Sequence, residues 1–243
     1  MENQMKHSKI LFIAAAFAAF GFVACGGDDN SNPAASGGSS GGNKAWNYLN
    51  PNIPYGEFVD SRDGQVYKTV QIGTQIWMAE NMDYAIEGSI LNTLGGKNGY
   101  GRLYNFNQAN GLYSNEKLCP VGWHLPSREE FLTLFASIGG VVNSPYTWEI
   151  SDVGKLLKSA KGWGTSGNGI DSFGFSAVPA RGCDSSPKNC GKDLTSQSDE
   201  YAKFWTSTPG AMGSIYVKFD ESNDVSLSEY YESHYYSVRC VMD

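Results

Sequence analysis

The amino-acid sequence predicts an exported α+β domain, in which an antiparallel sheet is built from both ends of the chain and two main helices lie between them. Three observations predict this fold class. Short runs of alternating apolar and polar residues occur early in the chain and again after Phe204. Two helical patterns lie mid-chain, and four cysteines beyond residue 100 are typical of a disulfide-stapled exported domain.

The composition supports a folded domain and argues against nucleic-acid binding. The chain has 243 residues, of which 41% are hydrophobic, 13% aromatic and only 18% charged. Its formal net charge is −7, whereas binding to nucleic-acid phosphates needs a basic surface. We therefore expect no nucleic-acid partner.

The first strands are predicted as a β-hairpin that follows the turn signal Asp63-Gly64. Apolar residues alternate with polar ones over residues 65–72 and again over residues 75–79, with Gly73-Thr74 between the two runs. Two period-two runs around a short glycine turn are typical of a hairpin. Residues 100–106 are aromatic and flanked by glycine, and they fit either a strand or the entry to a short helix.

Two helices are predicted between the strands. Ser127 is a good N-cap, and Glu130 three residues later completes a capping box. Five apolar residues at helical spacing follow before Gly139-Gly140 ends the helix, namely Phe131, Leu132, Leu134, Phe135 and Ile138. A second, shorter helix is expected over residues 152–160.

The chain after Phe204 is predicted to be rich in strands. Residues 204–208, 215–219, 224–229 and 235–242 all alternate, and the gaps between them have the length of hairpin turns. These runs complete the sheet that the first hairpin begins.

Residues 1–24 are predicted to be a signal peptide. A basic start precedes residues 10–24, which have no polar side chain but fall short of the roughly 18 to 20 residues that span a bilayer. The run ends in Phe22-Val23-Ala24-Cys25, which resembles the lipobox of bacterial lipoproteins, although Phe22 stands where Leu is usual. That resemblance implies cleavage before Cys25 and lipid attachment to it; an ordinary signal peptide that happens to end in Cys is the alternative.

Residues 25–54 are predicted to be a flexible tether, because ten of the first 18 are Gly or Ser and none is Lys or Arg. A single domain over residues 55–243 follows it. Gly26 follows Cys25, whereas Asp at this position retains lipoproteins of enteric bacteria in the inner membrane. We therefore expect an outer-membrane lipoprotein, with the domain facing the periplasm or the cell surface.

The four cysteines beyond the anchor are predicted to form two disulfides, because an even count in an exported protein indicates pairing. Four cysteines allow three pairings. Cys183 and Cys190 lie seven residues apart in one loop and are expected to pair locally, which leaves Cys119 to join Cys240. A metal site is the weaker alternative, since no Cys-x-x-Cys occurs and the two histidines of the mature chain lie 110 residues apart.

Several longer strings carry a resemblance to a known family. They are Asp63-Gly64-Gln65-Val66-Tyr67, Trp77-Met78-Ala79-Glu80-Asn81, Cys119-Pro120-Val121-Gly122-Trp123-His124-Leu125-Pro126-Ser127, Gly167-Asn168-Gly169-Ile170-Asp171, Gly174-Phe175-Ser176-Ala177, Phe204-Trp205-Thr206-Ser207-Thr208 and Ser237-Val238-Arg239-Cys240-Val241. Over residues 58–243 the chain resembles the Fibrobacter succinogenes major paralogous domain. The resemblance implies an exported protein, often a lipoprotein, whose fold is related to C-type lectins and to the formylglycine-generating-enzyme group. In such folds a disulfide ties the first helix region to the last strand, which agrees with a Cys119–Cys240 pair.

The activities of those related folds do not carry over residue by residue. Calcium-dependent lectins use Glu-Pro-Asn or Gln-Pro-Asp with Trp-Asn-Asp, and none of these strings occurs here. Formylglycine-generating enzymes use a reactive cysteine pair, whereas all four cysteines here are expected to form structural disulfides. The sequence also has no GxSxG, HExxH or P-loop motif. We therefore expect no catalytic residue, no metal ligand and no cofactor. Calcium held by Asn168 and Asp171 is the open alternative to a turn-forming role for these side chains.

Aromatic residues in polar, loop-like surroundings are the candidate ligand-binding residues, namely Tyr146, Trp148 and Trp163. An exposed ring can stack on the apolar face of a sugar, and core packing is the alternative for each of the three. The tyrosine-rich residues 230–236 are predicted to be an edge hairpin that is also compatible with a binding face. Trp77, Trp123 and Trp205 are assigned to the core.

These observations predict a cell-envelope lipoprotein that displays a non-catalytic binding domain, with a polysaccharide or another surface component as ligand. The membrane is a partner through the lipid anchor, and envelope proteins are further candidate partners. Two other functions remain open. One is a carbohydrate-active or protein-modifying enzyme. A glycosidase needs only two well-placed carboxylates, which a sequence cannot exclude even though no pair is marked out here. The other is a structural envelope protein.

Overall fold

A computed structural model describes residues 44–93, 99–112, 117–142, 148–164, 166–183, 185, 190 and 200–243. Most strand pairs are antiparallel and the helices are short, so the described part of the chain is α+β as predicted. None of its helices combines the length and apolarity that a bilayer span needs.

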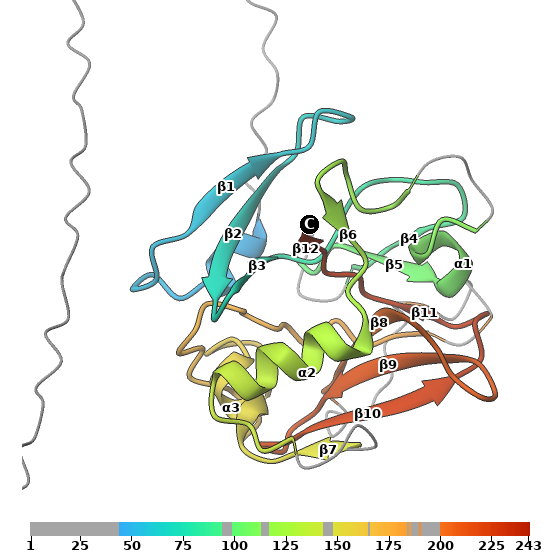
Figure 1. Cartoon of the computed structure of the whole chain (residues 1–243). Helices are drawn as coiled ribbons and strands as arrows, with labels where there is room; N and C mark the ends of the chain where they lie inside the picture. Colours follow the sequence, from blue (N-terminus) through green and yellow to red (C-terminus); the bar gives the residue numbers. More distant parts are fainter. Residues whose placement is uncertain are drawn as a thin grey trace, which may run out of the picture. The chain divides into compact units, whose positions relative to one another are not determined.

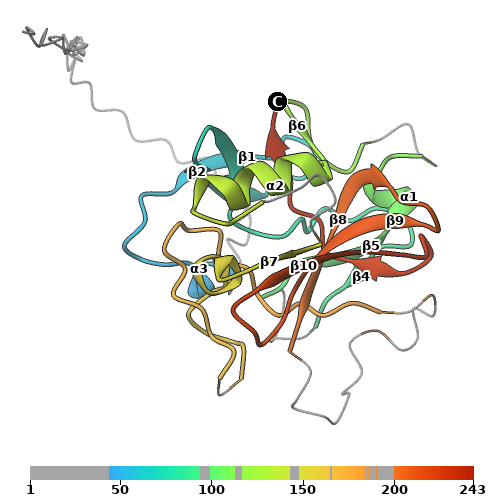
Figure 2. The same ribbon diagram turned by 60° about the horizontal axis from the view of Figure 1, so that its bottom comes forward.

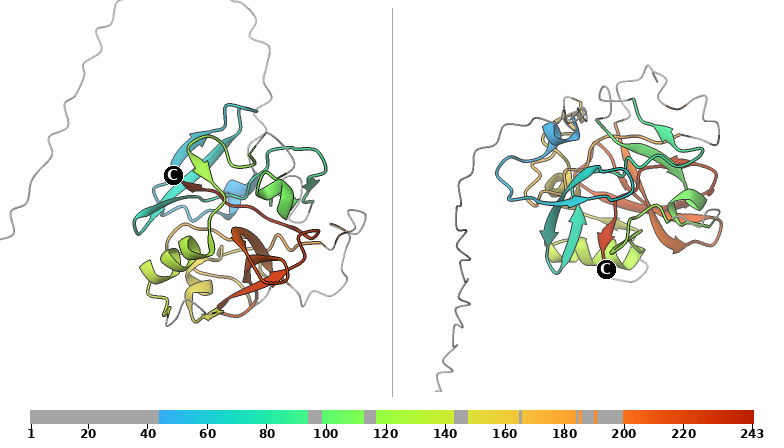
Figure 3. Two further views of the ribbon diagram at one scale, coloured as in Figure 1. Left: turned by 45° about the vertical axis from the view of Figure 1, so that its right-hand side comes forward. Right: turned by 90° about the horizontal axis from the view of Figure 1, so that it is seen from above.

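The first sheet unites the two ends of the folded region (Figure 1). It holds β1 (Gly56–Val59), β2 (Val66–Ile72), β3 (Gln75–Met78), β12 (Val241–Met242) and β6 (Trp123–His124), in that order and all antiparallel. The pair β2–β3 is the predicted hairpin. Because β12 lies between β3 and β6, the C-terminus of the chain lies next to β6 (Figure 3).

The prediction of one continuous sheet is wrong, because the remaining strands form two further sheets. One has the order β7 (Glu149–Ile150), β10 (Val225–Tyr230), β9 (Ser214–Phe219) and β8 (Ala202–Pro209). The other has the order β11 (Tyr235–Tyr236), β5 (Arg102–Asn105) and β4 (Ile90–Leu91). The predicted strand 235–242 therefore divides into β11 and β12, since the residues between them cross from one sheet to another.

In the described part of the chain, three short α-helices connect the strands. The helix α2 (Arg128–Ser137) has the predicted capping box, in which Ser127 Oγ accepts from Glu130 N at 3.2 Å and Glu130 Oε2 accepts from Ser127 N at 2.7 Å. The helix α1 (Phe106–Ala109) follows β5 directly, so the segment 100–106 enters both a strand and a helix. The helix α3 (Val153–Leu157) ends three residues early, because Lys158 is extended and pairs with Ala177.

The main core forms where α2 packs between the first hairpin and the strands β8, β9 and β10 (Figure 2). The five apolar residues predicted for the inner face of α2 all belong to it. A second core surrounds the buried rings of Trp123 and Trp205, whereas Trp77 lies in the first. All three tryptophans that the sequence assigned to the core are therefore buried.

The folded region begins before the predicted boundary at residue 55. Residues Lys44–Tyr48 form a 3-10 helix, and Trp46 Nε1 donates to Glu80 Oε2 at 3.0 Å. Leu49 and Ile53 pack against the main core. Residues 44–54 are therefore part of the folded domain rather than of the tether.

Both predicted disulfides are present. Cys119 joins Cys240 across 121 positions of sequence, with the two Cα atoms 5.9 Å apart. Cys183 joins Cys190 across seven positions, with a Cα–Cα distance of 5.2 Å. The first bond fastens the segment before β6 to the segment before β12, and the second closes a local loop.

We expect the two disulfides to stabilise the fold unequally. In the chain-entropy model, closing the long loop contributes about 5 kcal/mol and closing the short loop about 2.5 kcal/mol. The double variant C119A/C240A should therefore lose about twice as much unfolding free energy in urea as the matched variant C183A/C190A. Equal losses, or a larger loss for the short loop, would contradict this ranking.

Candidate binding site

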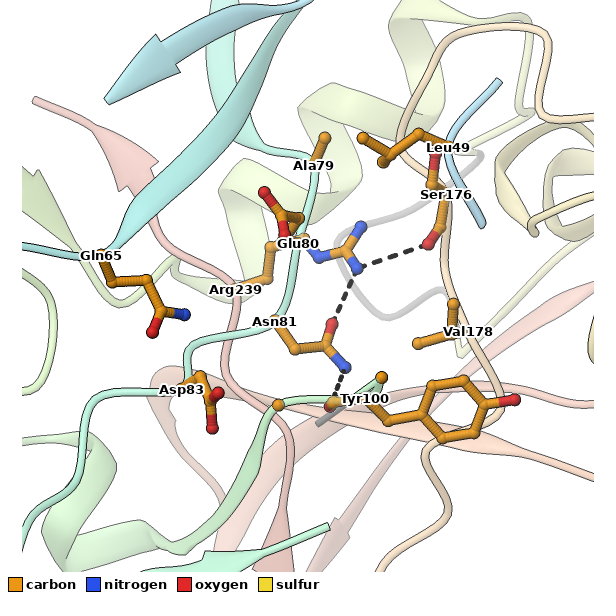
Figure 4. A pocket seen from close by; sticks show the side chains of 12 residues that line it. Leu49, Gln65, Ala79, Glu80, Asn81, Asp83, Tyr100, Ser176, Val178 and Arg239 are labelled. Carbon is orange, nitrogen blue, oxygen red and sulfur yellow. Dashed lines mark hydrogen bonds between the residues drawn. The ribbon is translucent and has the colours of Figure 1, made fainter. Parts of the chain in front are cut away.

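A polar pocket opens where the segments that follow β3, precede β5 and precede β12 meet the segment around Ser176 (Figure 4). The enclosed cavity has a volume of about 10 Å³, which is enough for about one water molecule or one hydroxyl group. Twelve residues line it. The polar side chains among them are Gln65, Glu80, Asn81, Asp83, Tyr100, Ser176 and Arg239.

The base of the pocket is the guanidinium of Arg239, a side chain that is only 1% exposed. Its Nη2 donates to Asn81 Oδ1 at 2.7 Å, and its Nη1 donates to the carbonyl oxygen of Phe175. The guanidinium carbon also lies 4.3 Å from the centroid of the Phe175 ring, a cation–π contact. Burial lowers the pKa of Arg239 to about 9, although Asp171 and Glu80 act to raise it, so the group stays cationic at neutral pH.

Glu80 lies beside this cation and is itself buried. Its Oε2 accepts from the backbone nitrogen of Lys68 at 2.6 Å and from Trp46 Nε1 at 3.0 Å. Burial raises the pKa of Glu80 to about 7, against the opposing effect of these two donors and of Arg239. The two hydrogen bonds connect the 3-10 helix to β2 through the Glu80 carboxyl group. The raised pKa means that this carboxyl group changes its protonation state near neutral pH.

A third acidic group, Asp171, lies behind the pocket wall. Its Oδ2 accepts from Ser176 Oγ at 2.5 Å and its Oδ1 from Ser176 N at 2.8 Å, while the hydroxyl of Tyr55 lies 3.2 Å from the same Oγ. Burial raises the pKa of Asp171 to about 6. These bonds hold Ser176 in a left-handed conformation with φ 51°.

The residues considered for calcium serve the backbone instead. Asp171 is fully buried in the contacts just described, and Asn168 Oδ1 accepts from Trp163 N at 3.0 Å. Within the described ranges no three His, Cys, Asp or Glu side chains converge on a common metal position. Both residues thus make hydrogen bonds to backbone nitrogens, as a turn-forming role requires.

Two polar atoms of the pocket residues have no hydrogen-bond partner in the described part of the chain, Arg239 Nε and Asp83 Oδ1. Burial raises the pKa of Asp83 to about 6, whereas the nearby charge of Arg102 and a hydrogen bond from Gln65 lower it. Figure 4 shows the side chains of Gln65 and Asp83 together on one side of the pocket. A hydroxyl group can accept from Nε–H and donate to a carboxylate oxygen, so hydroxyl groups suit this pair of atoms.

The structure separates the aromatic residues predicted to bind ligand. Trp148 is 45% exposed and lies 5.5 Å from the guanidinium of Arg128, so it is available at the surface. The prediction for Trp163 is wrong, because its side chain is fully buried and its Nε1 donates to Ala177 O at 2.9 Å. Tyr146, and the anchor residue Cys25, lie outside the described residues.

The pocket residues were not identified as a site from the sequence. A signal exists in two of the strings, since Glu80-Asn81 directly follows the apolar Trp77-Met78-Ala79 and Arg239 stands between Val238 and Cys240. Ionic groups inside apolar runs are buried and need partners. The sequence does not show that Arg239 pairs with Asn81, because the two residues are 158 positions apart.

A comparison with protein families matches residues 70–242 to the Fibrobacter succinogenes major domain. The chain belongs to this family. The match confirms the resemblance carried by the sequence strings, and it includes Glu80, Asp83 and Arg239 of the pocket. No match to this chain was found among curated proteins or among solved structures.

We expect the major domain to lose stability as the pH rises from about 5 to about 8. A carboxyl group whose pKa is higher in the folded chain keeps its proton longer there, so folding is favoured at low pH and the benefit disappears as pH rises through the folded pKa. Glu80, Asp83 and Asp171 all act in this direction. For Glu80, a rise from 4.5 to about 7 corresponds to about 3 kcal/mol.

Urea unfolding at pH 5 and pH 8 measures this loss, and Glu80→Gln should reduce the difference between the two pH values. Glu87→Gln, which changes an exposed carboxyl group, is the matched control and should leave the difference unchanged. An unfolding free energy that stays constant or rises from pH 5 to pH 8 would contradict the prediction, because ionising the buried carboxyl groups would then not destabilise the fold.

Proposed function

We propose that this chain is a lipid-anchored protein of the cell envelope whose major domain binds a polyhydroxylated ligand, such as a saccharide, without catalysing a reaction on it. The observation that carries the proposal is that two residues lining this pocket each have a buried polar atom without a hydrogen-bond partner in the described part of the chain, the donor Arg239 Nε and the acceptor Asp83 Oδ1. A hydroxyl group of the ligand fits the size of the enclosed cavity. Leaving buried polar groups unpaired is costly, so a ligand that satisfies both gains affinity.

The other walls of the pocket suit the same ligand class. Gln65 offers an amide that can both donate and accept, next to the carboxylate of Asp83. Leu49 and Val178 supply apolar wall, and saccharides present C–H faces between their hydroxyl groups. A few directed polar groups set in apolar wall are typical of small-molecule sites.

Binding without catalysis is supported by the state of the polar groups in the pocket. Ser176 Oγ is buried and donates to Asp171, so it is not presented to a ligand. Oε2 of Glu80 accepts from two donors of the chain. The Ser176 hydroxyl is therefore not presented to a ligand as a nucleophile.

An enzymatic function is the second candidate, and one observation favours it. Glu80 and Asp83 line one pocket and have raised pKa values, of about 7 and about 6. Perturbed carboxyl pairs of this kind occur at acid–base active sites. Hydrolysis of an oligosaccharide by the wild-type chain, abolished by Glu80→Gln, would establish that function in place of simple binding.

For binding, we expect Asp83→Asn to weaken affinity for a neutral oligosaccharide at least about tenfold, since the variant replaces a charged acceptor whose hydrogen bonds each contribute about 1.5–3 kcal/mol. A glycan array with the purified chain identifies the oligosaccharide, and isothermal titration calorimetry gives the dissociation constant. Asp152→Asn, at an exposed position outside the pocket, is the matched control and should bind like the wild type. Failure of the array to retain any neutral saccharide would refute the proposal.

For the anchor, we expect Cys25→Ser to abolish incorporation of labelled palmitate and to release the chain from the membrane fraction of expressing bacteria. The hydrophobic segment before Cys25, the lipobox-like string and the Gly/Ser-rich residues after it support this proposal. Ser31→Ala is the control and should stay labelled and membrane-bound. Label that persists in the Cys25→Ser chain would rule out lipid attachment at this residue.

A further inference from the structure

Lys203 of β8 lies among four tyrosine rings on the side of its sheet that faces away from the main core. Its Nζ is 5.3 Å from the ring centroid of Tyr201, 4.8 Å from Tyr216, 5.9 Å from Tyr230 and 4.9 Å from Tyr236. These rings come from the segment before β8 and from β9, β10 and β11. Aromatic faces stabilise a cation but leave its charge without a counter-ion.

No carboxylate of the described residues pairs with Lys203. Its register partner on β9 is a second lysine, Lys218, whose own Nζ pairs with Asp220 at 3.0 Å. Burial, together with the like charge of Lys218, lowers the pKa of Lys203 to about 8. In a chain of net charge −7, this ammonium group is thus a half-buried positive site without an internal partner in the described part of the chain.

One of the four rings, that of Tyr236, also carries a buried hydrogen-bonding group. The hydroxyl of Tyr236 is buried and has no hydrogen-bond partner in the described part of the chain. Burial raises the pKa of Tyr236, and the nearby Tyr216, Tyr201 and Tyr230 raise it further, so this phenol remains a donor. An ammonium group and a phenol donor together suit an anionic oxygen.

Flat apolar surface adjoins the same position. Tyr230 is 44% exposed and Tyr231 is 64% exposed, and their rings meet edge to face with centroids 5.2 Å apart. Tyr230 also lies edge to face with His234 at 4.5 Å, which helps to hold its ring in place. An exposed and oriented tyrosine ring can stack on the apolar face of a sugar.

We propose that Lys203, Tyr230 and Tyr236 form a second binding site, which takes an acidic saccharide with its carboxylate on Lys203 Nζ and its ring face on Tyr230. The site is distinct from the pocket at Arg239, because none of its three residues lines that pocket. It adds a charged ligand class to the neutral polyhydroxylated one, and it does not depend on the function proposed for the pocket.

Lysine footprinting of the unmodified full chain tests the site without any variant. Reductive methylation of lysines, followed by mass spectrometry, is carried out with and without trigalacturonic acid. Methylation of Lys203 should slow about tenfold when the free ligand is at ten times its dissociation constant, while the exposed Lys161 should react at an unchanged rate. Galactotriose, which lacks the carboxylates, should protect neither lysine. Equal protection by both sugars, or none by trigalacturonic acid, would overturn the proposal.

Calorimetry on variants then assigns the contacts. Lys203→Met, which keeps most of the length of the side chain and removes its charge, should weaken binding of trigalacturonic acid about tenfold or more. Lys161→Met removes the same charge at an exposed position and should bind like the wild type. Tyr230→Leu, at an exposed ring, should also weaken binding and serves in place of Lys203→Met if that variant does not fold. Wild-type affinity in Tyr230→Leu or in a folded Lys203→Met would overturn the proposal.

Discussion

The buried guanidinium of Arg239 is the constraint on which the rest of the domain depends. A cation in a protein interior is stable only when it is hydrogen-bonded and compensated by negative charge, and here Asn81, the carbonyl of Phe175 and the carboxyl groups of Glu80 and Asp171 meet these needs. Two chain segments, each distant in sequence from Arg239, therefore converge on this residue. Removing one partner of such a buried arrangement typically costs about 3–5 kcal/mol, because the remaining charge is left unpaired.

The position of Arg239 in the chain explains why the pocket is built where it is. The next residue, Cys240, forms the long-range disulfide with Cys119, and β12 follows between β3 and β6. A covalent bond and an ionic network thus fasten adjacent residues of the same segment. Because Arg239 also holds Asn81, the backbone on both sides of Asn81 is fixed, and with it the carboxyl groups of Glu80 and Asp83 that face the pocket.

Local patterns in the sequence predicted local structure well. The capping box at Ser127, the hairpin around Gly73 and the short disulfide at Cys183 each depend on residues within a few positions, and all three are present. Long-range features were harder to predict. Polar neighbours in the sequence suggest that the Trp163 side chain is exposed. In the structure its ring is buried in the main core, and its indole nitrogen donates to Ala177 O. The candidate site was missed for the same reason, since Arg239 meets its partners only after the chain has folded.

The attachment of residues 44–48 to the domain has a mechanical consequence if the chain is anchored at Cys25 as proposed. Drag on the domain would be transmitted first to Trp46, which is held by its bond to Glu80 and by the Lys68 ammonium 4.4 Å above its ring. These contacts are weak beside the covalent Cys119–Cys240 bond, which closes a loop that does not include the 3-10 helix. Force would therefore peel the 3-10 helix from β2 and lengthen the link to the membrane, while the strands between Cys119 and Cys240 keep their arrangement.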